Sequence, residues 1–260
     1  MSGSLKYPQV VADLLRARAT FGIATSLAAL NLKSIDSGYE VQSEFAASSG
    51  LTTVGWKIGA TSAISQKALG LEEPASAYLF KQSTFVSPAT IEIPNARCVL
   101  EAEVTVELAR ALPRRNAAYT IEEIAASIAA IYPSIEVCFA RVDTAGPVSP
   151  PVAIADNFYH GALVLGPRRT DWQNLDLASL QVKLQLGDAP AKPGSGSNVL
   201  EHPFNAVRWL ANDGSTRAEL AAGDLIATGA CVSTVVESGL IGKATFDDLG
   251  EVKFELVRKP

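Results

Sequence analysis

Residues 98–109 read CVLEAEVTVELA, and this alternation of apolar and polar side chains is typical of a β-strand. Successive side chains of a strand point to opposite faces, so one face is apolar and the other carries Glu101 and Glu103. These two acids are neighbours on that face, with Cα atoms about 6.5–7 Å apart. The segment alone leaves two interpretations open: a solvated strand face, or a site that binds a cation.

A third acid lies in a similar pattern at residues 132–141, YPSIEVCFAR. Alternation places Glu136 on the same face as Cys138, and a lone carboxylate is costly to bury beside small apolar neighbours. A cation shared with Glu101 and Glu103 would offset that cost, and three carboxylates with water suit Mg²⁺ or Mn²⁺. The alternative is a buried salt bridge from Glu136 to a basic residue: Arg97, Arg141 or a lysine.

A lysine in residues 54–62, VGWKIGATS, is the candidate acid or base. Lys57 projects between Gly55 and Gly59, on the strand face opposite to Trp56. The two glycines leave room for a ligand, and a lysine near a metal can have its pKa lowered and transfer protons. The alternative is a solvated lysine on an edge strand.

Three further segments read as loops at strand or helix ends. Residues 155–161, ADNFYHG, precede the strand ALVLG, and residues 223–230 place a Thr-Gly pair at a strand end. Residues 195–197 precede a helix start whose backbone N–H groups could meet an anion, but the Lys-Ser/Thr of a P-loop is missing. Nucleotide binding is therefore not expected. With only His160 and His202 in the chain, a histidine-built metal site is not expected either.

The periodicity predicts an α+β fold in one domain, 1–260. A helical N-terminal segment, 1–50, includes helices beginning at Pro8 and spanning 37–48. A β-rich body, 51–260, is interrupted by two helices. One follows the capping box at Thr120 and is ended by Pro133, and the other runs from Pro203 to residues 212–214. Residues 190–198 read as a loop.

Composition narrows the classes of function. The 260 residues are 48% hydrophobic and 19% charged, with a net charge of −5, which excludes disorder and argues against nucleic acid or anionic membrane as partners. No run approaches the roughly 20 apolar residues of a membrane span. Three cysteines without metal-site spacing fit a reducing compartment, so we expect a cytoplasmic protein.

In chain order, these segments resemble the 2-keto-4-pentenoate hydratase group of the fumarylacetoacetate hydrolase superfamily. The group also contains 2-oxo-hept-4-enedioate hydratase and 4-oxalocrotonate decarboxylase. The resemblance covers about four fifths of the chain. It is carried by Tyr39-Glu40-Val41-Gln42, residues 55–62 (GWKIGATS), Glu101-Ala102-Glu103, Glu136, Ala155-Asp156-Asn157, Asn198-Val199-Leu200, Trp209-Leu210-Ala211, Gly223-Asp224 and Thr228-Gly229.

The resemblance implies a mixed β-roll and a metal-dependent lyase. Glu101, Glu103 and Glu136 match the family's metal carboxylates, around Mg²⁺ or Mn²⁺, and Lys57 matches its active-site lysine. The implied reaction adds water to a small 2-hydroxy-2,4-dienoic acid to give a 4-hydroxy-2-oxo acid. We also expect a homo-oligomer. The predicted substrate contacts are Asp156, Tyr159, His160, Thr228 and Gly229.

Two departures from the family pattern bear on the substrate. Where hydratases carry an acid in a P-D-x-G-x-L-x-x-D-M stretch, residues 74–83 have Lys81 or Gln82. Phe158, Tyr159 and His160 replace small residues. We expect these three to set substrate choice; packing of the two aromatic rings in the core is the alternative.

Other activities stay open at this stage. A decarboxylase of a 4-oxalocrotonate-like acid would use the same chelation. A C–C bond hydrolase or isomerase of a related 2-oxo acid is a further alternative, although the hydrolases typically use an N-terminal histidine and none precedes His160. A non-catalytic binding protein that kept the fold is the alternative from another class.

Overall fold

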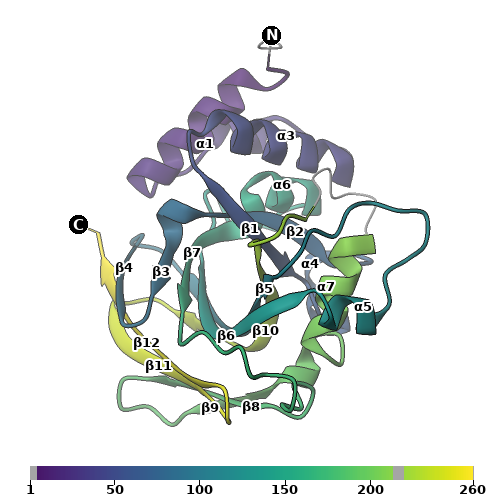
Figure 1. The fold of residues 1–260 in the computed structure, drawn as a ribbon. Helices are drawn as coiled ribbons and strands as arrows, with labels where there is room; N and C mark the ends of the chain where they lie inside the picture. Colours follow the sequence, from purple (N-terminus) through teal and green to yellow (C-terminus); the bar gives the residue numbers. More distant parts are fainter. Residues whose placement is uncertain (1–4, 213–219, 260) are drawn as a thin grey trace.

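The computed structural model describes residues 5–212 and 220–259. Two curled β-sheets form the body of the molecule, and a group of helices packs over one end of it (Figure 1). This group consists of α1 (Pro8–Thr20), α2 (Thr25–Ala29), α3 (Ile35–Ser48) and α6 (Pro150–Ala155). The α+β class and the helical N-terminal segment predicted from the sequence are confirmed.

The larger sheet carries every strand on which the sequence placed a candidate acid or lysine. In the described part of the chain its order is β2 (Ala75–Phe80), β1 (Thr53–Gly59), β10 (Leu225–Val236), β5 (Cys98–Leu108), β6 (Ile128–Cys138), β7 (His160–Leu165) and β3 (Thr84–Val86). Strands β5 and β6 are antiparallel, and Glu101 lies opposite Glu136 in their register. Two of the candidate acids are therefore cross-strand partners.

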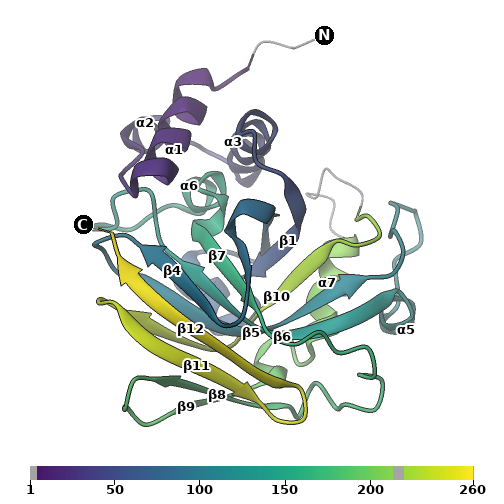
Figure 2. The ribbon, with the colours of Figure 1, turned by 60° about the vertical axis from the view of Figure 1, so that its left-hand side comes forward.

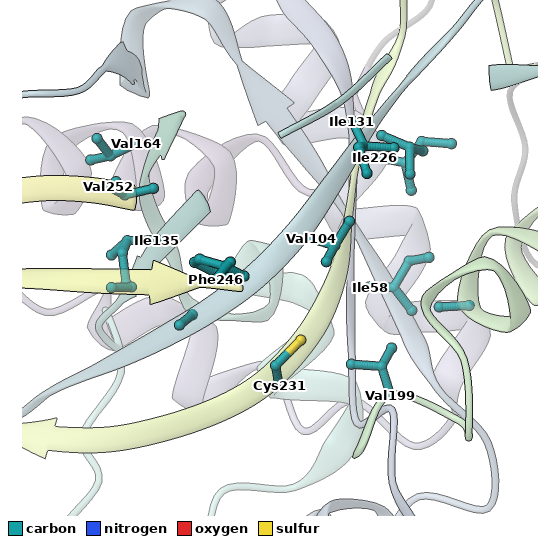
Figure 3. Close-up of a cluster of buried hydrophobic side chains, with 14 of the residues drawn as sticks. Ile58, Val104, Ile131, Ile135, Val164, Val199, Ile226, Cys231, Phe246 and Val252 are labelled. Atoms are coloured by element: carbon teal, nitrogen blue, oxygen red, sulfur yellow. The ribbon is translucent and has the colours of Figure 1, made fainter. Parts of the chain in front are cut away.

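The smaller sheet packs against one face of the larger sheet (Figure 2). Its order is β4 (Ala89–Ile93), β12 (Gly250–Arg258), β11 (Leu240–Phe246), β8 (Gln181–Leu186) and β9 (Lys192–Ser195). Figure 3 shows the core, where Val104 and Ile135 of the larger sheet lie with Phe246 and Val252 of the smaller one. Burial of these side chains supplies the main driving force that holds the two sheets together.

One predicted helix is largely a strand. The sequence predicted a helix from Thr120 to Pro133, but α5 (Ile121–Ala125) ends early, and β6 runs through Pro133. The spacing of Ile128, Ile131 and Ile135 is typical of a helix. Pairing along the length of β5 outweighs this pattern: a register shift in the pairing sets Ile128 opposite Leu108 and Ile131 opposite Val106, on one face, and β-branched side chains pack well on a buried sheet. The carbonyl of Pro133 still accepts a hydrogen bond, from the N–H of Gly166.

Other elements differ from the expectation in smaller ways. Strands β2 and β11 were not predicted, and the expected loop 190–198 contains the edge strand β9, where Pro193 is tolerated. Helix α4 (Ala63–Leu69) was also missed, although Ser62 caps it. Helix α7 (Pro203–Asn212) begins as predicted, and the predicted stop at 213–214 lies outside the described residues. No helix in the described ranges is long and apolar enough to cross a membrane.

Candidate active site

The larger sheet brings the predicted lysine and acids to one of its faces. On β5, the apolar alternates face the core shared with the smaller sheet, and Glu101 and Glu103 point the other way. Glu103 and Glu136 are each 0% exposed, which shows that the solvated-face interpretation is wrong. Trp56 of β1 lies in the core, so Lys57 shares the face of the acids, as the alternation predicted.

Lys57 is buried at the centre of this cluster. Strand β1 lies between β2 and β10, so the edge-strand alternative is wrong, and 2% of the residue is exposed. Its Nζ lies 3.4 Å from Glu136 Oε1. Burial opposes the charged form, but the negative charge of the nearby acids, with Glu136 the first of them, outweighs it, so the pKa of Lys57 is raised. The sequence analysis described a lowering of this pKa by a nearby metal, whereas the carboxylates that surround Lys57 act in the opposite direction.

Glu136 uses one carboxylate oxygen for two contacts. Its Oε1 lies 2.7 Å from His160 Nδ1 and also takes the ion pair with Lys57. Burial by itself raises the pKa of Glu136, but these two neighbours outweigh it and the pKa is lowered. The salt-bridge alternative is thus realised with a lysine. Within the described residues, Glu136 Oε2 has no hydrogen-bond partner.

Glu103 is held by the backbone at a bend of β10. The N–H of Gly229 donates to Glu103 Oε2 at 2.9 Å, and Thr228 Oγ1 donates to the carbonyl of Val104 at 2.8 Å. Gly229 has φ +106°, and a Cβ there would stand 2.2 Å from Thr61 Oγ1, so this position requires glycine. Burial first, and then Glu136, raise the pKa of Glu103 well above its usual value. Its Oε1 is buried and has no hydrogen-bond partner among the described groups.

Cys138 was missed as a potential ligand. One ligand atom each of Glu101, Glu136 and Cys138 lie within 4.8 Å of one another, and Cys138 Sγ lies 3.9 Å from Lys57 Nζ. Burial and the nearby Glu136 raise the pKa of the thiol well above its usual value, so it stays protonated at neutral pH. The alternation on β6 carried the signal, since Cys138 follows Glu136 by two residues.

The segment after α6 is held in place by the hydrogen bonds of two buried side chains. Asp156 is buried and accepts from the backbone N–H of Arg141 at 2.6 Å and from its Nη1 at 3.3 Å. Asn157 pairs with the backbone of Tyr78 through both amide atoms, each at 2.9 Å. Three consecutive residues, Asn157 to Tyr159, have positive φ, a conformation that costs non-glycine residues energy and is held by these contacts.

The strained turn aims an aromatic ring at the lysine. Phe158 is 5% exposed and its ring centroid lies 4.8 Å from Lys57 Nζ, a cation–π contact. His160 is fully buried at the start of β7. Phe158 therefore packs in the interior, as the packing alternative expected, and also touches the predicted catalytic lysine. Its effect on substrate choice, and that of Tyr159 and His160, stays a prediction.

A cavity of about 1140 Å³ adjoins the cluster. Of the predicted lysine and metal carboxylates, Glu101 is the one that lines it among the described residues. The turn after β1, the segment before α7, α7 itself and β10 form its walls. Lys81 and Gln82 lie outside it and are exposed. The lining also includes residues that sequence analysis did not single out, among them Lys192, Asn205 and Arg208. Because Glu101 is partly exposed, it connects the buried acids to the cavity.

Comparison with known proteins finds relatives that match most of this chain. The chain is 31% identical to 2-keto-4-pentenoate hydratase from Paraburkholderia xenovorans (strain LB400), over 85% of this chain and 83% of that protein. It is also 31% identical to 2-keto-4-pentenoate hydratase 2 from Dechloromonas aromatica (strain RCB), over 97% and 98%. Among solved structures, 4-oxalocrotonate decarboxylase from Pseudomonas putida G7, complexed with magnesium and adipate, has the same fold. Its TM-score is 0.84 at 24% identity, over 98% of this chain and 99% of that one.

The decisive match is to a family model. Residues 57–257 match the model of the fumarylacetoacetate hydrolase C-terminal domain, a span that begins at Lys57 and includes all three candidate metal-binding acids. The match takes in both sheets except the first part of β1 and the end of β12. The chain belongs to the fumarylacetoacetate hydrolase family.

Proposed function

We propose that this protein is a divalent-metal-dependent hydratase that adds water to a 2-hydroxy-2,4-dienoate and yields a 4-hydroxy-2-oxo acid. The observation that carries the proposal is the group formed by the buried acids Glu103 and Glu136 and the partly exposed Glu101 around Lys57, which opens to a large cavity through Glu101. The relatives named 2-keto-4-pentenoate hydratase, matched over most of the chain, support the reaction class.

The acids fit a hard divalent cation. Glu103 Oε1 and Glu136 Oε2 are buried oxygens without a hydrogen-bond partner in the described ranges, and such orphans are costly unless a cation or a proton satisfies them. Glu101 adds a third carboxylate from the cavity side. We propose Mg²⁺ or Mn²⁺ as the ion, in agreement with the magnesium of the decarboxylase structure. A bound ion would stabilise negative charge on the 2-oxo-carboxylate end of the substrate.

The chain's own part in the chemistry is proton transfer and orientation. The ion pair with Glu136 holds the Lys57 ammonium at the cluster, and we assign it the proton that is added to C5 of the dienoate, while the 2-hydroxyl gives its proton to water. Water then adds across the C3–C4 double bond, with hydroxyl at C4 and hydrogen at C3. The Gly229 N–H fixes Glu103 throughout, because its position is set by the backbone.

We further propose that residues 1–260 act as one catalytic domain, because Arg18 of α1 reaches the carbonyl of His160 beside the cluster. Contacts from Asp156, Tyr159, His160, Thr228 or Gly229 to the substrate, a homo-oligomeric state and a cytoplasmic location stay predictions. Light scattering on the purified protein measures the oligomeric state. Crystals soaked with Mg²⁺ and oxalate would show which residues touch the 2-oxo-carboxylate end.

The test is turnover of 2-hydroxypenta-2,4-dienoate by metal-free protein with and without added Mg²⁺ or Mn²⁺. We expect metal-dependent loss of the dienol's ultraviolet absorbance and a 4-hydroxy-2-oxo acid by NMR. Release of CO₂ from a 4-oxalocrotonate-type diacid, without hydration, would indicate a decarboxylase, the activity for which the fold neighbour is named. C–C cleavage would indicate a hydrolase and double-bond migration an isomerase, whereas binding without turnover would leave a binding protein.

A further inference from the structure

His160 occupies a position that the proposed hydration does not use. It is fully buried at the first residue of β7, in contact with Glu136, and it does not line the cavity beside the cluster. A buried imidazole has two ring nitrogens that need partners. Here both have one. Nδ1 lies 2.7 Å from Glu136 Oε1, and Nε2 lies 3.3 Å from Ser83 Oγ.

The partners fix which nitrogen carries the proton. A carboxylate oxygen can only accept, so Nδ1 of His160 is the donor to Glu136. Nε2 of the neutral ring is then an acceptor, and the Ser83 hydroxyl, which also lies 3.3 Å from the carbonyl of Phe80, donates to it. Ser83 Oγ in turn accepts from Arg18 Nη2 at 3.2 Å, while Arg141 Nη2 donates to the His160 carbonyl at 2.7 Å. A chain of hydrogen bonds thus runs from helix α1 to the Glu136 carboxylate.

The consequence concerns the second oxygen of Glu136. Since His160 and Lys57 both occupy Oε1, the carboxylate is fixed with Oε2 buried and free of hydrogen bonds in the described part of the chain. We propose that His160 is a positioning residue for the metal site: its Nδ1–H orients Glu136 so that Oε2 is presented to the cation. This inference rests on the proposed metal-dependent function. Outer partners of this kind typically change metal affinity by about 10–100-fold.

The first experiment reads the tautomer without metal or substrate. In ¹⁵N-labelled, metal-free protein, a long-range ¹⁵N–¹H spectrum contains two imidazole rings, and the His202→Gln variant assigns them. We expect His160 as the neutral Nδ1–H form in the wild type and in Ser83→Ala alike, because the Glu136 carboxylate can only accept. An Nε2–H ring in the wild type overturns the proposal, whether or not the protein binds a metal.

The second experiment measures metal affinity in two complementary variants. His160→Asn keeps an amide N–H near the place of Nδ1, whereas His160→Gln moves it toward Ser83. We expect the dissociation constant for Mn²⁺, measured by calorimetry, to rise about 10–100-fold in His160→Gln and only a few-fold in His160→Asn. His202→Gln is the matched control and should bind as the wild type does. Equal affinity in the two His160 variants, or an unchanged constant in His160→Gln, overturns the proposal.

The outcomes separate this inference from the proposed function. If the wild type binds no Mn²⁺, the proposed metal-dependent function fails, while the tautomer result still reports on the His160–Glu136 contact. If His160→Gln does not fold, Ser83→Ala replaces it, because loss of the Nε2 partner frees the ring. We then expect Mn²⁺ binding to weaken several-fold, and an unchanged constant in the folded Ser83→Ala variant overturns the inference.

Discussion

The ring of Phe158 lies against the backbone of Gly59, so that a Cβ on Gly59 would stand 2.2 Å from Cε1 of the ring. The same ring contacts the Lys57 ammonium, two residues earlier on β1. The sequence predicted that the glycines beside Lys57 would leave room for a ligand. On the Gly59 side, that room is filled by an aromatic side chain of the chain itself.

Gly59→Ala should therefore displace Phe158 and loosen its contact with Lys57. We expect the free energy of unfolding to fall by about 1–3 kcal/mol, the usual cost of overpacking, as measured by urea denaturation. Gly146→Ala is the control, because a Cβ there meets no atom within 4 Å. In the Phe158→Ala background, Gly59→Ala should cost much less; an equal cost in both backgrounds would show that the ring is not the obstacle.

Divalent metal should stabilise the fold through the buried acids. At about a hundred times its dissociation constant, Mg²⁺ or Mn²⁺ is expected to raise the free energy of unfolding by about 2.7 kcal/mol. Glu103→Gln should abolish this rise, whereas Glu107→Gln, on the same strand but paired with Arg168, should keep it. Thermal melts with EDTA and with added metal measure the effect, and melting temperatures that ignore the metal would refute the site.

Lys57→Met tests the proton donor. With folding verified in saturating Mg²⁺, we expect turnover to fall by about 10²–10⁴-fold. The metal-free variant should be less stable than the wild type, because Glu136 loses its ion pair in a buried site. Lys183→Met, at an exposed position of β8, is the matched control. Turnover equal to that of the wild type would exclude Lys57 from the chemistry.

Glu107 should make the free energy of unfolding fall as the pH is lowered into the acid range. Two hydrogen bonds from Arg168, at 2.8 and 2.9 Å, are the main cause that lowers the pKa of Glu107 below 4.5, and Tyr132 adds to them. Because the pKa of Glu107 is lower in the folded than in the unfolded state, its ionised form stabilises the fold at pH values above the unfolded-state pKa. This stabilisation is lost as the pH falls through the folded-state pKa.

The comparison that isolates this contribution is Glu107→Gln against the wild type between neutral pH and about pH 3. We expect the variant to be less stable at neutral pH and to lose less stability in acid, as measured by urea denaturation. Exposed Glu237→Gln serves as the control. Parallel curves for Glu107→Gln and the wild type would show that the pairing contributes nothing.

Local periodicity was enough to place the main candidate groups. A strand has a two-residue repeat, so Glu101 and Glu103 had to share a face, and Lys57 had to point away from Trp56. Burial of Trp56 and the apolar alternates of β5 then sent the acids and the lysine to the same side of the sheet. The capping box at Thr120 is equally local, although the end of α5 was not predicted correctly.

What the tertiary structure decided is which of these faces meet. The contact of Lys57 with Glu136 depends on the strand order and the curl of the larger sheet, and local sequence periodicity determines neither of them. The predicted helix is the strand β6 for the same reason, because pairing with β5 outweighs the helix-like spacing of its isoleucines. His160 contacts Glu136 because β6 and β7 are neighbours. Sequence alone thus determined the residue types and their faces, and long-range strand pairing determined the site they form.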